Sequence, residues 1–311
     1  MRGDGRPTLA AALVDFPCDL CGSDSLRVVR PARYSGQESL DDVLADFRSS
    51  AENPLHDRLS ECRQCGLVFV SPRLPEGLIV QGYADAVDPR HLAQAAAREA
   101  SFGRALDGLL ARHRWLRPTG ATPLLDIGCA GGSFLAAARE RGFDVRGIEP
   151  SAWLAEQGRA HYGLPIDAGL FDADRYGEGS FDVVTLWDVL EHVSSPRELL
   201  AGIHRVLRPG GALIINVPTI DSVTARILRG RWPFYLGVHL YYFTTRTLTR
   251  YLVETGFAPM GHRPYWQTLP LGYVVERGSG GRVGQSALPS LLGNAPFRYN
   301  MGQRTFVARR S

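Results

Sequence analysis

The sequence predicts an α/β protein in which a small metal-binding module precedes a doubly wound, mainly parallel sheet. From Ala121 onward, strand-like apolar runs alternate with amphipathic helical runs, a pattern typical of such a sheet. The first strand of that region leads into a glycine-rich turn, and the apolar run at 181–187 is typical of a buried central strand. Before this region, residues 16–74 hold two Cys-x-x-Cys-Gly motifs. We therefore expect two parts of different construction in one chain.

Each element of the sheet region is delimited by its hydrophobic pattern and by the turn residues around it. Strands are expected at 123–127, 143–148, 165–168, 181–187 and 212–217, and an antiparallel pair at 257–266 and 304–309 closes the sheet. Helices are expected from the glycine turn to Arg141, at 151–163, at 196–207 and at 244–254. A longer alanine-rich helix is expected before them, at 88–114. The chain thus divides into a flexible tail (1–15), the cysteine module (16–74), a helical connector or lid (75–118) and the sheet domain (119–311).

The composition excludes several classes of function. The 311 residues are 44% hydrophobic and 22% charged, as in an ordinary globular protein, and the net charge of +3 is too small to indicate a nucleic-acid partner. The chain contains no lysine, which rules out a Schiff base and a lysine-containing phosphate loop. No apolar run approaches the length of a membrane span, and the apolar stretch at 9–14 is too short for a secretory signal. We therefore expect a cytoplasmic protein without a membrane partner.

Four of the five cysteines form two near-identical knuckles that predict a structural zinc site. Each Cys-x-x-Cys-Gly motif directs two thiolates to one point, and four thiolates form the tetrahedral set that zinc prefers. The gap between the motifs is wider than usual, and a polar insert at about 35–54 accounts for it. A redox-active dithiol pair and unliganded cysteines remain the alternatives. The expected ligands are Cys18, Cys21, Cys62 and Cys65.

The glycine turn after the first strand carries two acidic residues that narrow the choice of ligand. Glu149 ends the second strand, where a carboxylate accepts hydrogen bonds from the ribose hydroxyls of an adenosine, and NAD would satisfy it too. Asp126 precedes Gly128 by two residues and would repel a pyrophosphate at this helix N-terminus. S-adenosylmethionine (SAM) carries an ammonium and a sulfonium group instead, and both would favour this carboxylate. The alternative is that the two acids merely cap helices.

These residues resemble the first motif of the class I SAM-dependent methyltransferases, which reads roughly D-x-G-x-G-x-G, with Ala130 in place of the middle glycine. The resemblance covers about residues 121–260 and includes the runs Phe181-Asp182-Val183-Val184 and Leu207-Arg208-Pro209-Gly210-Gly211. It implies a Rossmann-like sheet of seven strands and SAM as cofactor. It also implies that Asp126 lies near the amino group of SAM, that Glu149 binds the ribose and that Trp187 and Asp188 face the junction of cofactor and substrate. The implied contacts to the methionine part of SAM are Gly128, Ala130 and Gly132. The implied contacts to the adenine are Pro150, Gly169, Leu170 and Phe171.

The end of the cysteine module resembles a second family feature. The run from Cys65 to Arg73 is similar to the end of a zinc ribbon that precedes many bacterial methyltransferases of natural-product and sugar pathways. This resemblance implies a small-molecule acceptor rather than a macromolecule. It leaves the oligomeric state undetermined.

Candidate catalytic residues follow the fourth strand and lie in the irregular stretch at about 218–244, which the fold places over the substrate side. Glu191 and His192 form a Glu-His-Val triplet, which helps to bind a divalent cation in some relatives or supports the cofactor loop. His239 is the expected base or acceptor-orienting residue, because a neutral imidazole accepts a proton near physiological pH. A histidine that only shapes the lid is the alternative. Expected substrate contacts are Tyr83, Arg231, Trp232, Tyr241 and Tyr242.

The sequence therefore predicts SAM-dependent methyl transfer to oxygen, nitrogen or carbon of a small biosynthetic intermediate. An RNA methyltransferase guided by the ribbon is a second hypothesis. Against it, the Asn-Pro-Pro-Tyr motif of many base-amino methylases is replaced here by Trp187-Asp188-Val189-Leu190. A SAM-binding protein that transfers no methyl group is the third.

Overall fold

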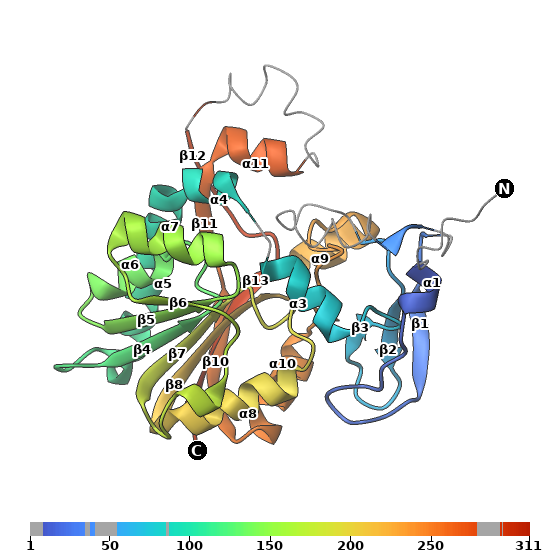
Figure 1. Cartoon of the computed structure of the whole chain (residues 1–311), viewed down its shortest axis with the longest axis horizontal. Helices are drawn as coiled ribbons and strands as arrows, with labels where there is room; N and C mark the ends of the chain where they lie inside the picture. Colours follow the sequence, from blue (N-terminus) through green and yellow to red (C-terminus); the bar gives the residue numbers. More distant parts are fainter. Residues whose placement is uncertain (1–8, 35–37, 41–54, 85–86, 279–292, 294) are drawn as a thin grey trace.

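Seven strands form the central sheet of the computed structural model, in the order β10-β13-β8-β7-β4-β5-β6 (Figure 1). The structure describes residues 9–34, 38–40, 55–84, 87–278, 293 and 295–311. β4, β5, β6, β7 and β8 are parallel, and β13 and β10 add an antiparallel edge. The strands are β4 (Pro123–Ile127), β5 (Asp144–Glu149), β6 (Ile166–Ala168), β7 (Phe181–Trp187), β8 (Leu207–Pro218), β10 (Phe257–Pro264) and β13 (Gln303–Arg310). The predicted α/β class and seven-stranded sheet are confirmed.

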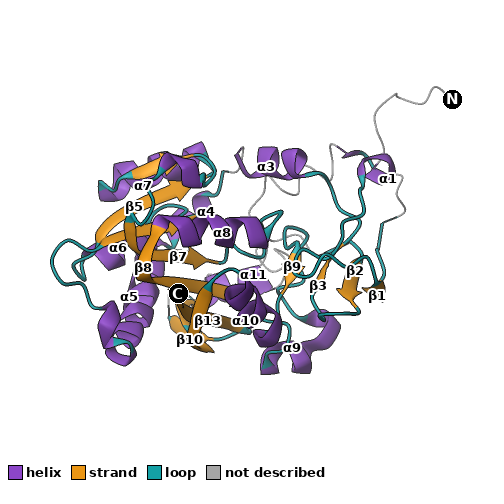
Figure 2. Ribbon diagram, turned by 90° about the horizontal axis from the view of Figure 1, so that it is seen from below, coloured by secondary structure: helices purple, strands orange, loops and turns teal. Residues whose placement is uncertain are grey.

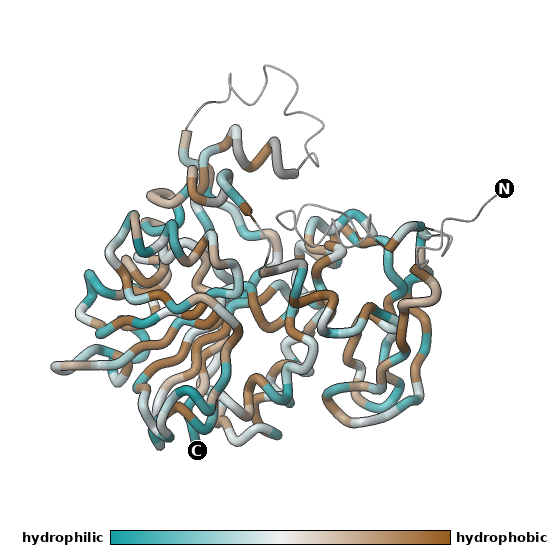
Figure 3. The backbone as a smooth tube through the Cα atoms, in the orientation of Figure 1, coloured by the Kyte–Doolittle hydropathy of each residue, from teal (hydrophilic) through white to brown (hydrophobic). Residues whose placement is uncertain are grey.

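Helices cover both faces of this sheet. Successive residues of a strand point to opposite faces, so the apolar central strands present side chains to be buried on each face. Leu124 and Val183 pack on one face against α5 (Ala95–Arg112), α6 (Ser133–Arg139) and α7 (Ala152–Tyr162). Leu125 and Val184 pack on the other face against α8 (Pro196–Val206) and α10 (Thr245–Glu254). Figure 3 shows the corresponding apolar character along the central strands. The runs predicted as fully buried strands are therefore buried on two sides.

Helix ends agree with the predicted turn chemistry in several places. The Ser151 hydroxyl accepts a hydrogen bond from Leu154 N at the start of α7, and Gly163 ends this helix with φ +62°. The first helix of the sheet ends at Arg139 rather than at Arg141. The helix expected at 88–114 is divided into α4 (Pro89–Ala93) and α5. The remaining elements of the connector are α3 (Glu76–Ala84) and the short 3-10 helix η1 (Arg114–Leu116); the 3-10 helix η2 (Ala173–Arg175) lies within the sheet domain.

A second, four-stranded sheet joins the cysteine module to the sheet domain, in the order β1-β2-β3-β9. Three of its strands belong to the module, β1 (Leu26–Arg30), β2 (Leu59–Cys62) and β3 (Val68–Val70), whereas β9 (Tyr241–Tyr242) belongs to the stretch at 218–244. Figure 2 shows these four strands side by side, at the end of the molecule away from α5 and α6. The sequence predicted neither β9 nor the hairpin of β11 (Gln267–Pro270) and β12 (Pro296–Tyr299). Further elements are α9 (Val223–Leu228), the 3-10 helix η3 (Arg229–Arg231) and α11 (Leu271–Gly278).

Asp19, in the first knuckle, attaches the cysteine module to the helices under the sheet. Its carboxylate accepts hydrogen bonds from Ser195 Oγ at 2.8 Å, from the Arg197 backbone N at 3.1 Å and from the Tyr251 hydroxyl at 2.9 Å. The Arg197 guanidinium donates a hydrogen bond from Nε to the Asp19 backbone carbonyl at 3.0 Å. The module therefore contacts both α8 and α10.

Part of the segment expected to be a flexible tail is packed. α1 (Leu9–Ala12) buries Leu9, which is 2% exposed, and Val14 forms an isolated bridge with Arg73. Residues 1–8 lie outside the described residues. Among the residues described, no helix combines the length and apolar character that crossing a membrane requires.

Replacing Asp19 by alanine is expected to lower the free energy of unfolding by about 1–3 kcal/mol, because three donors lose their common acceptor. Urea denaturation measures this difference. Asp24→Ala, which removes an exposed carboxylate of the same module, serves as the control and should stay within about 0.5 kcal/mol of the parent. Equal losses in the two variants would contradict the attachment that we assign to Asp19.

Candidate active site and cysteine cluster

The turn between β4 and α6 brings backbone atoms close to the carboxyl edge of the sheet. Gly128 and Gly132 have φ of +69° and +80°, in the left-handed region that favours glycine. A Cβ atom at Gly128 would lie 2.6 Å from Val189 Cγ2, so the chain packs too closely there for any side chain. Ala130, which replaces the expected middle glycine, also has a positive φ, of +46°. The turn is thus a cradle whose shape depends on left-handed backbone.

Glu149, at the end of β5, is tied to the cradle by its side chain. Its Oε2 accepts a hydrogen bond from Ala130 N at 2.8 Å, and its Oε1 accepts one from Ser151 N at 2.9 Å. The residue is only 8% exposed, and burial raises its pKa, while the two N–H donors oppose that shift. Each carboxylate oxygen has a further lone pair, so the group remains able to accept bonds from a pair of ribose hydroxyls.

Asp126 places a second carboxyl group beneath the same turn. It is 1% exposed and accepts a hydrogen bond from Thr185 Oγ1 at 2.5 Å. The pKa of Asp126 is raised to about 8: burial is the main cause, the bond from Thr185 opposes the shift, and the charge of Glu149 adds to it. Two buried acids next to a left-handed cradle form a site that suits a cationic ligand and disfavours a pyrophosphate.

The expected adenine contacts are only partly brought together. Gly169 N donates to the Glu149 carbonyl at 2.8 Å, which holds the end of β6 beside β5, and Leu170 is 50% exposed at this edge. Phe171 instead stacks on Tyr176, and its ring lies 3.1 Å from the position of a Cβ at Gly202 of α8. Its ring therefore packs on α8, which does not fit the expected adenine contact. Pro150 is half-buried between Glu149 and the Ser151 cap.

Trp187 and Asp188, at the end of β7, have different surroundings. Trp187 is 8% exposed and its ring packs among the aromatic rings of Phe102, Phe134 and Tyr265; its contact at the cofactor junction stays a prediction. Asp188 adopts φ +56° at the edge of the sheet. This left-handed conformation is unusual for a residue other than glycine and is often found at functional sites.

Two amides that the sequence analysis missed hold the Asp188 carboxylate. Gln303 Nε2 lies 2.7 Å from each carboxylate oxygen, and Asn216 Nδ2 donates at 2.9 Å. Gln303 begins β13 and Asn216 lies in β8, so the adjoining strands orient this acid. No local motif marks either amide, and only the strand order brings them to Asp188.

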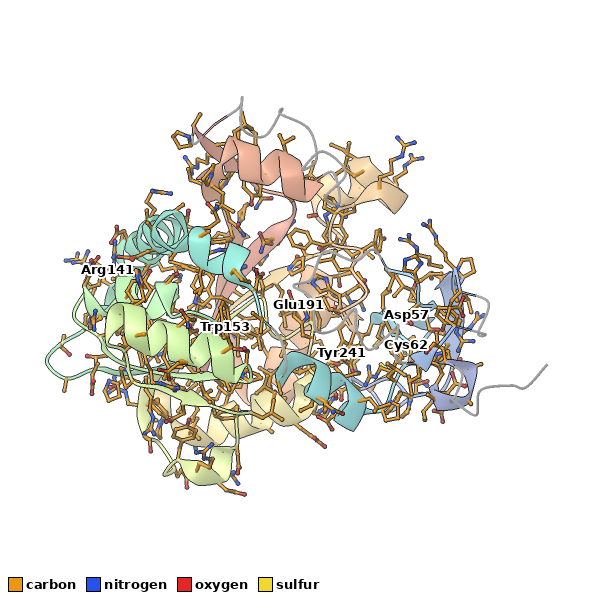
Figure 4. All side chains as sticks on the ribbon, turned by 45° about the horizontal axis from the view of Figure 1, so that its top comes forward. Asp57, Cys62, Arg141, Trp153, Glu191 and Tyr241 are labelled. Atoms are coloured by element: carbon orange, nitrogen blue, oxygen red, sulfur yellow. The ribbon has the colours of Figure 1, made fainter. Side chains whose placement is uncertain are left out.

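The structure brings Glu191, His192 and His239 together in one cluster, which the sequence indicates only as two separate groups. One ligand atom from each lies within 4.8 Å of the others, and the two imidazole rings are 4.7 Å apart at their centroids. His192 Nδ1 lies 3.0 Å from the Val238 carbonyl, and burial lowers the pKa of His192 to about 4, so this ring is neutral at pH 7. Figure 4 shows Glu191 and Tyr241 between the sheet domain and the module that carries Cys62.

Glu191 is the acid of this cluster, and its side chain is fully buried. It is 0% exposed, and neither carboxylate oxygen has a hydrogen-bond partner among the described residues. Burial raises its pKa well above the ordinary value, and the charge of Asp188 adds to that shift. A buried carboxyl group without donors favours its protonated form or a cation beside it.

Most of the residues expected to contact the substrate have side chains buried in the protein interior. Tyr241 donates its hydroxyl to the Ser194 carbonyl at 2.9 Å, Tyr242 donates to the Leu236 carbonyl at 3.2 Å, and both residues are 2% exposed. Trp232 is also 2% exposed and donates to the Met301 carbonyl. These three side chains pack and hydrogen-bond inside the protein, which does not fit substrate contact. Arg231 is exposed in η3, and the side chain of Tyr83 lies outside the described residues.

The four cysteines of the module form one compact cluster. The Sγ atoms of Cys18 and Cys65 are 3.4 Å apart, those of Cys21 and Cys62 are 3.5 Å apart, and all four lie within 4.8 Å of one another without a disulfide. Four sulfurs around a tetrahedral zinc at about 2.3 Å would be separated by about 3.8 Å. Gly22 and Gly66, each with positive φ, follow the second cysteine of the two knuckles and donate to the carbonyls of Cys18 and Cys62. The donor set and spacing fit a closed zinc site.

A cavity of about 460 Å³ lies away from the glycine turn. It opens between α5 and the strands β10, β12 and β13, on the side of Tyr265. The residues that line it include Arg104, Arg263, Arg298 and Trp266. The glycine turn itself is approached by Leu92 of α4, whose Cδ2 would lie 2.6 Å from a Cβ at Gly131.

Comparison with known proteins was made for the sequence and for the fold. Residues 90–260 match the family model described as a methyltransferase domain. A 99-residue stretch is 35% identical to the ubiquinone biosynthesis O-methyltransferase of Pseudomonas aeruginosa (strain UCBPP-PA14), covering 30% of this chain and 43% of that protein. A 208-residue stretch is 31% identical to an uncharacterized 37.1 kDa protein in a transposon of Streptomyces fradiae, covering 65% of this chain and 55% of that protein. The chain thus spans about half the length of the curated relatives that it matches.

Among solved structures, a SAM-dependent methyltransferase of Thermotoga maritima, described as a possible histamine N-methyltransferase, superimposes with a TM-score of 0.47 at 20% identity. The superposition covers 71% of this chain and 94% of that one.

The raised pKa of Asp126 predicts a pH dependence for the binding of SAM. Below a pKa of about 8 the unliganded acid holds a proton, and a cationic ligand favours its release. The affinity should therefore rise with pH by up to about tenfold per pH unit below 8 and level off above it. Calorimetry between pH 6 and pH 9 measures this, with Asp126→Asn as the variant that loses the slope. The same slope in Asp126→Asn would assign it to another group.

Proposed function

We propose, from the premise that this chain belongs to the methyltransferase domain family, that it transfers the methyl group of SAM to a small-molecule acceptor. The observation that carries the proposal is the pair of buried acids, Asp126 and Glu149, on either side of a left-handed glycine turn at the carboxyl edge of the sheet. This edge is where parallel α/β sheets bind their ligands.

The cofactor side of the proposal assigns roles to residues of three strands. Glu149 accepts bonds from the ribose hydroxyls, Asp126 compensates the positive charge of the amino acid part, and the turn from Gly128 to Gly132 lets the backbone approach it. Leu170 offers an exposed apolar surface to the adenine. SAM supplies an activated methyl group on a sulfonium.

The acceptor side consists of the cluster of Glu191, His192 and His239. Methyl transfer requires the acceptor atom, the methyl carbon and the sulfur in one line, and an acceptor hydroxyl must also lose a proton. His239 is proposed to take that proton or to orient the acceptor. His192, neutral and bonded at Nδ1 to a carbonyl, and the buried Glu191 would hold the geometry around it.

A small acceptor is supported by those curated relatives that are named ubiquinone biosynthesis O-methyltransferase. The methylated atom of this chain's acceptor is left as oxygen, nitrogen or carbon. RNA as acceptor is the weaker hypothesis, because the net charge of the chain is only +3. We also propose that the module of Cys18, Cys21, Cys62 and Cys65 holds a structural zinc ion, supported by the distances among the four sulfurs. A cytoplasmic location remains a proposal from the sequence.

His239→Gln should retain SAM binding and lose about 10²–10⁴-fold in turnover, because the proton acceptor is removed while the cofactor site stays intact. The measurement is transfer of labelled methyl from SAM into a bacterial metabolite extract, together with release of S-adenosylhomocysteine. His161→Gln, an exposed histidine at the end of α7, is the matched control and should keep parental turnover.

Three results would change the proposal. Full turnover by His239→Gln would remove His239 from this role. Labelling of RNA instead of small molecules would favour the ribbon-guided alternative. No release of S-adenosylhomocysteine by the parent protein, despite tight SAM binding, would favour a protein that binds SAM without transferring the methyl group.

A further inference from the structure

The cysteine module is hydrogen-bonded directly to the segment that carries His239. β3 and β9 pair in antiparallel fashion, with Val68 opposite Tyr242 and Phe69 opposite Tyr241, and the rings of Phe69 and Tyr241 stack at 6.1 Å. Val70 N adds a bond to the Leu240 carbonyl at 2.8 Å. The module therefore extends its own sheet into the acceptor side of the site.

The turn that carries Glu191 is attached to the same segment by backbone bonds. The amides of Leu240 and Tyr241 both donate to the Glu191 carbonyl, at 2.8 and 3.1 Å. Together with the approach of His192 Nδ1 to the Val238 carbonyl, these contacts join residues 191–192 to residues 238–241. The relative position of the two imidazoles depends on this junction.

Arg73 closes the junction from the module side. Its Nη2 donates to the Ser194 carbonyl at 2.8 Å and to the Tyr241 hydroxyl at 3.2 Å, and that hydroxyl donates in turn to the same carbonyl. Ser194 is two residues after His192, and Tyr241 is two residues after His239. The Arg73 guanidinium therefore bonds to both segments, each time two residues from a histidine.

The Arg73 side chain is itself held in place. It is 5% exposed, and its guanidinium lies over the rings of Phe16 and Tyr241, at 4.4 and 5.1 Å from their centroids. Its backbone exchanges two hydrogen bonds of 2.9 Å with Val14. A buried cation that bonds to a carbonyl and a phenol is costly to desolvate, and such a group contributes geometry that an apolar residue would not.

We propose that Arg73 is a positioning residue, whose guanidinium holds the turn of Glu191 and His192 against the segment of His239. The catalytic meaning of this placement rests on the proposed function, whereas the placement itself does not. Arg73 acts on the two histidines through its bonds to Ser194 and Tyr241.

The experiment uses the full-length, metal-replete protein with histidine labelled in its ring, so that no acceptor is needed. The signals of His192 and His239 are assigned with His192→Gln and His239→Gln, and hydrogen exchange is followed by mass spectrometry over residues 188–196 and 236–244. The variants are Arg73→Met, Arg73→Lys and Tyr241→Phe. Arg58→Met is the control, because Arg58 also bonds to a carbonyl of the module, that of Ser71, but contacts Asp15 instead of the junction.

Arg73→Met should shift both histidine signals and speed exchange in the two segments by about tenfold to hundredfold, as expected for loss of a charge-assisted bond. Arg73→Lys should recover part of this effect, and Arg58→Met should show none. SAM affinity should stay within about twofold of the parent in every variant, because the cofactor side is not attached to Arg73.

Unmoved histidine signals and unchanged exchange in Arg73→Met would overturn the proposal. If Arg73→Met does not fold, Tyr241→Phe decides in its place, since it removes the hydroxyl through which Arg73 bonds to the segment of His239 and leaves the direct bond from Arg73 to Ser194. Full turnover by His239→Gln with shifted signals in Arg73→Met would contradict the proposed role of His239 alone. No release of S-adenosylhomocysteine by the parent protein, with the same shifted signals, would contradict the proposed function alone. The two failures are therefore distinguishable.

Discussion

The proposed acceptor side of this protein depends on one short antiparallel contact, the pairing of β3 with β9. Through it, the cysteine module, the turn after β7 and the segment of His239 form one hydrogen-bonded unit. A two-residue strand has little stability of its own. The position of β9 is therefore set by the cysteine module. Because this module is too short to build a large hydrophobic core, its four cysteines add to its stability.

The two halves of the site have different physical origins. The cofactor side is built by the parallel sheet, whose carboxyl edge brings Asp126 and Glu149 to either side of the glycine turn. The acceptor side is built where separate parts of the chain meet: Glu191 and His192 follow β7, His239 precedes β9, and Arg73 comes from the module. This division explains why the module shares a hydrophobic core with α8 and α10 instead of standing apart.

Much of the sheet could be predicted from the sequence because its elements are determined locally. The run at 181–187 is mostly apolar since both of its faces are buried, and α7 is delimited by Ser151 and Gly163 through ordinary capping. The acids around the glycine turn and the four cysteines were predicted for the same reason, as short motifs with fixed spacing. The features that the sequence did not predict depend on contacts between residues that are far apart in the chain. Phe171 and Tyr241 belong to suitable motifs, but the packing of α8 and of the module directs their side chains inward. The bond from Gln303 to Asp188 spans 115 residues, and no local pattern indicates it.

The most direct test of this account is hydrogen exchange of residues 238–242 before and after removal of metal from the cysteine module with a chelator. Metal analysis of the untreated protein should find one zinc per chain. On its removal, exchange at 238–242 should accelerate together with that of β2 and β3, while β4 and β5 at the cofactor side remain protected. Unchanged protection at 238–242 in protein shown to be free of metal would contradict the claim that the module holds the acceptor side in place.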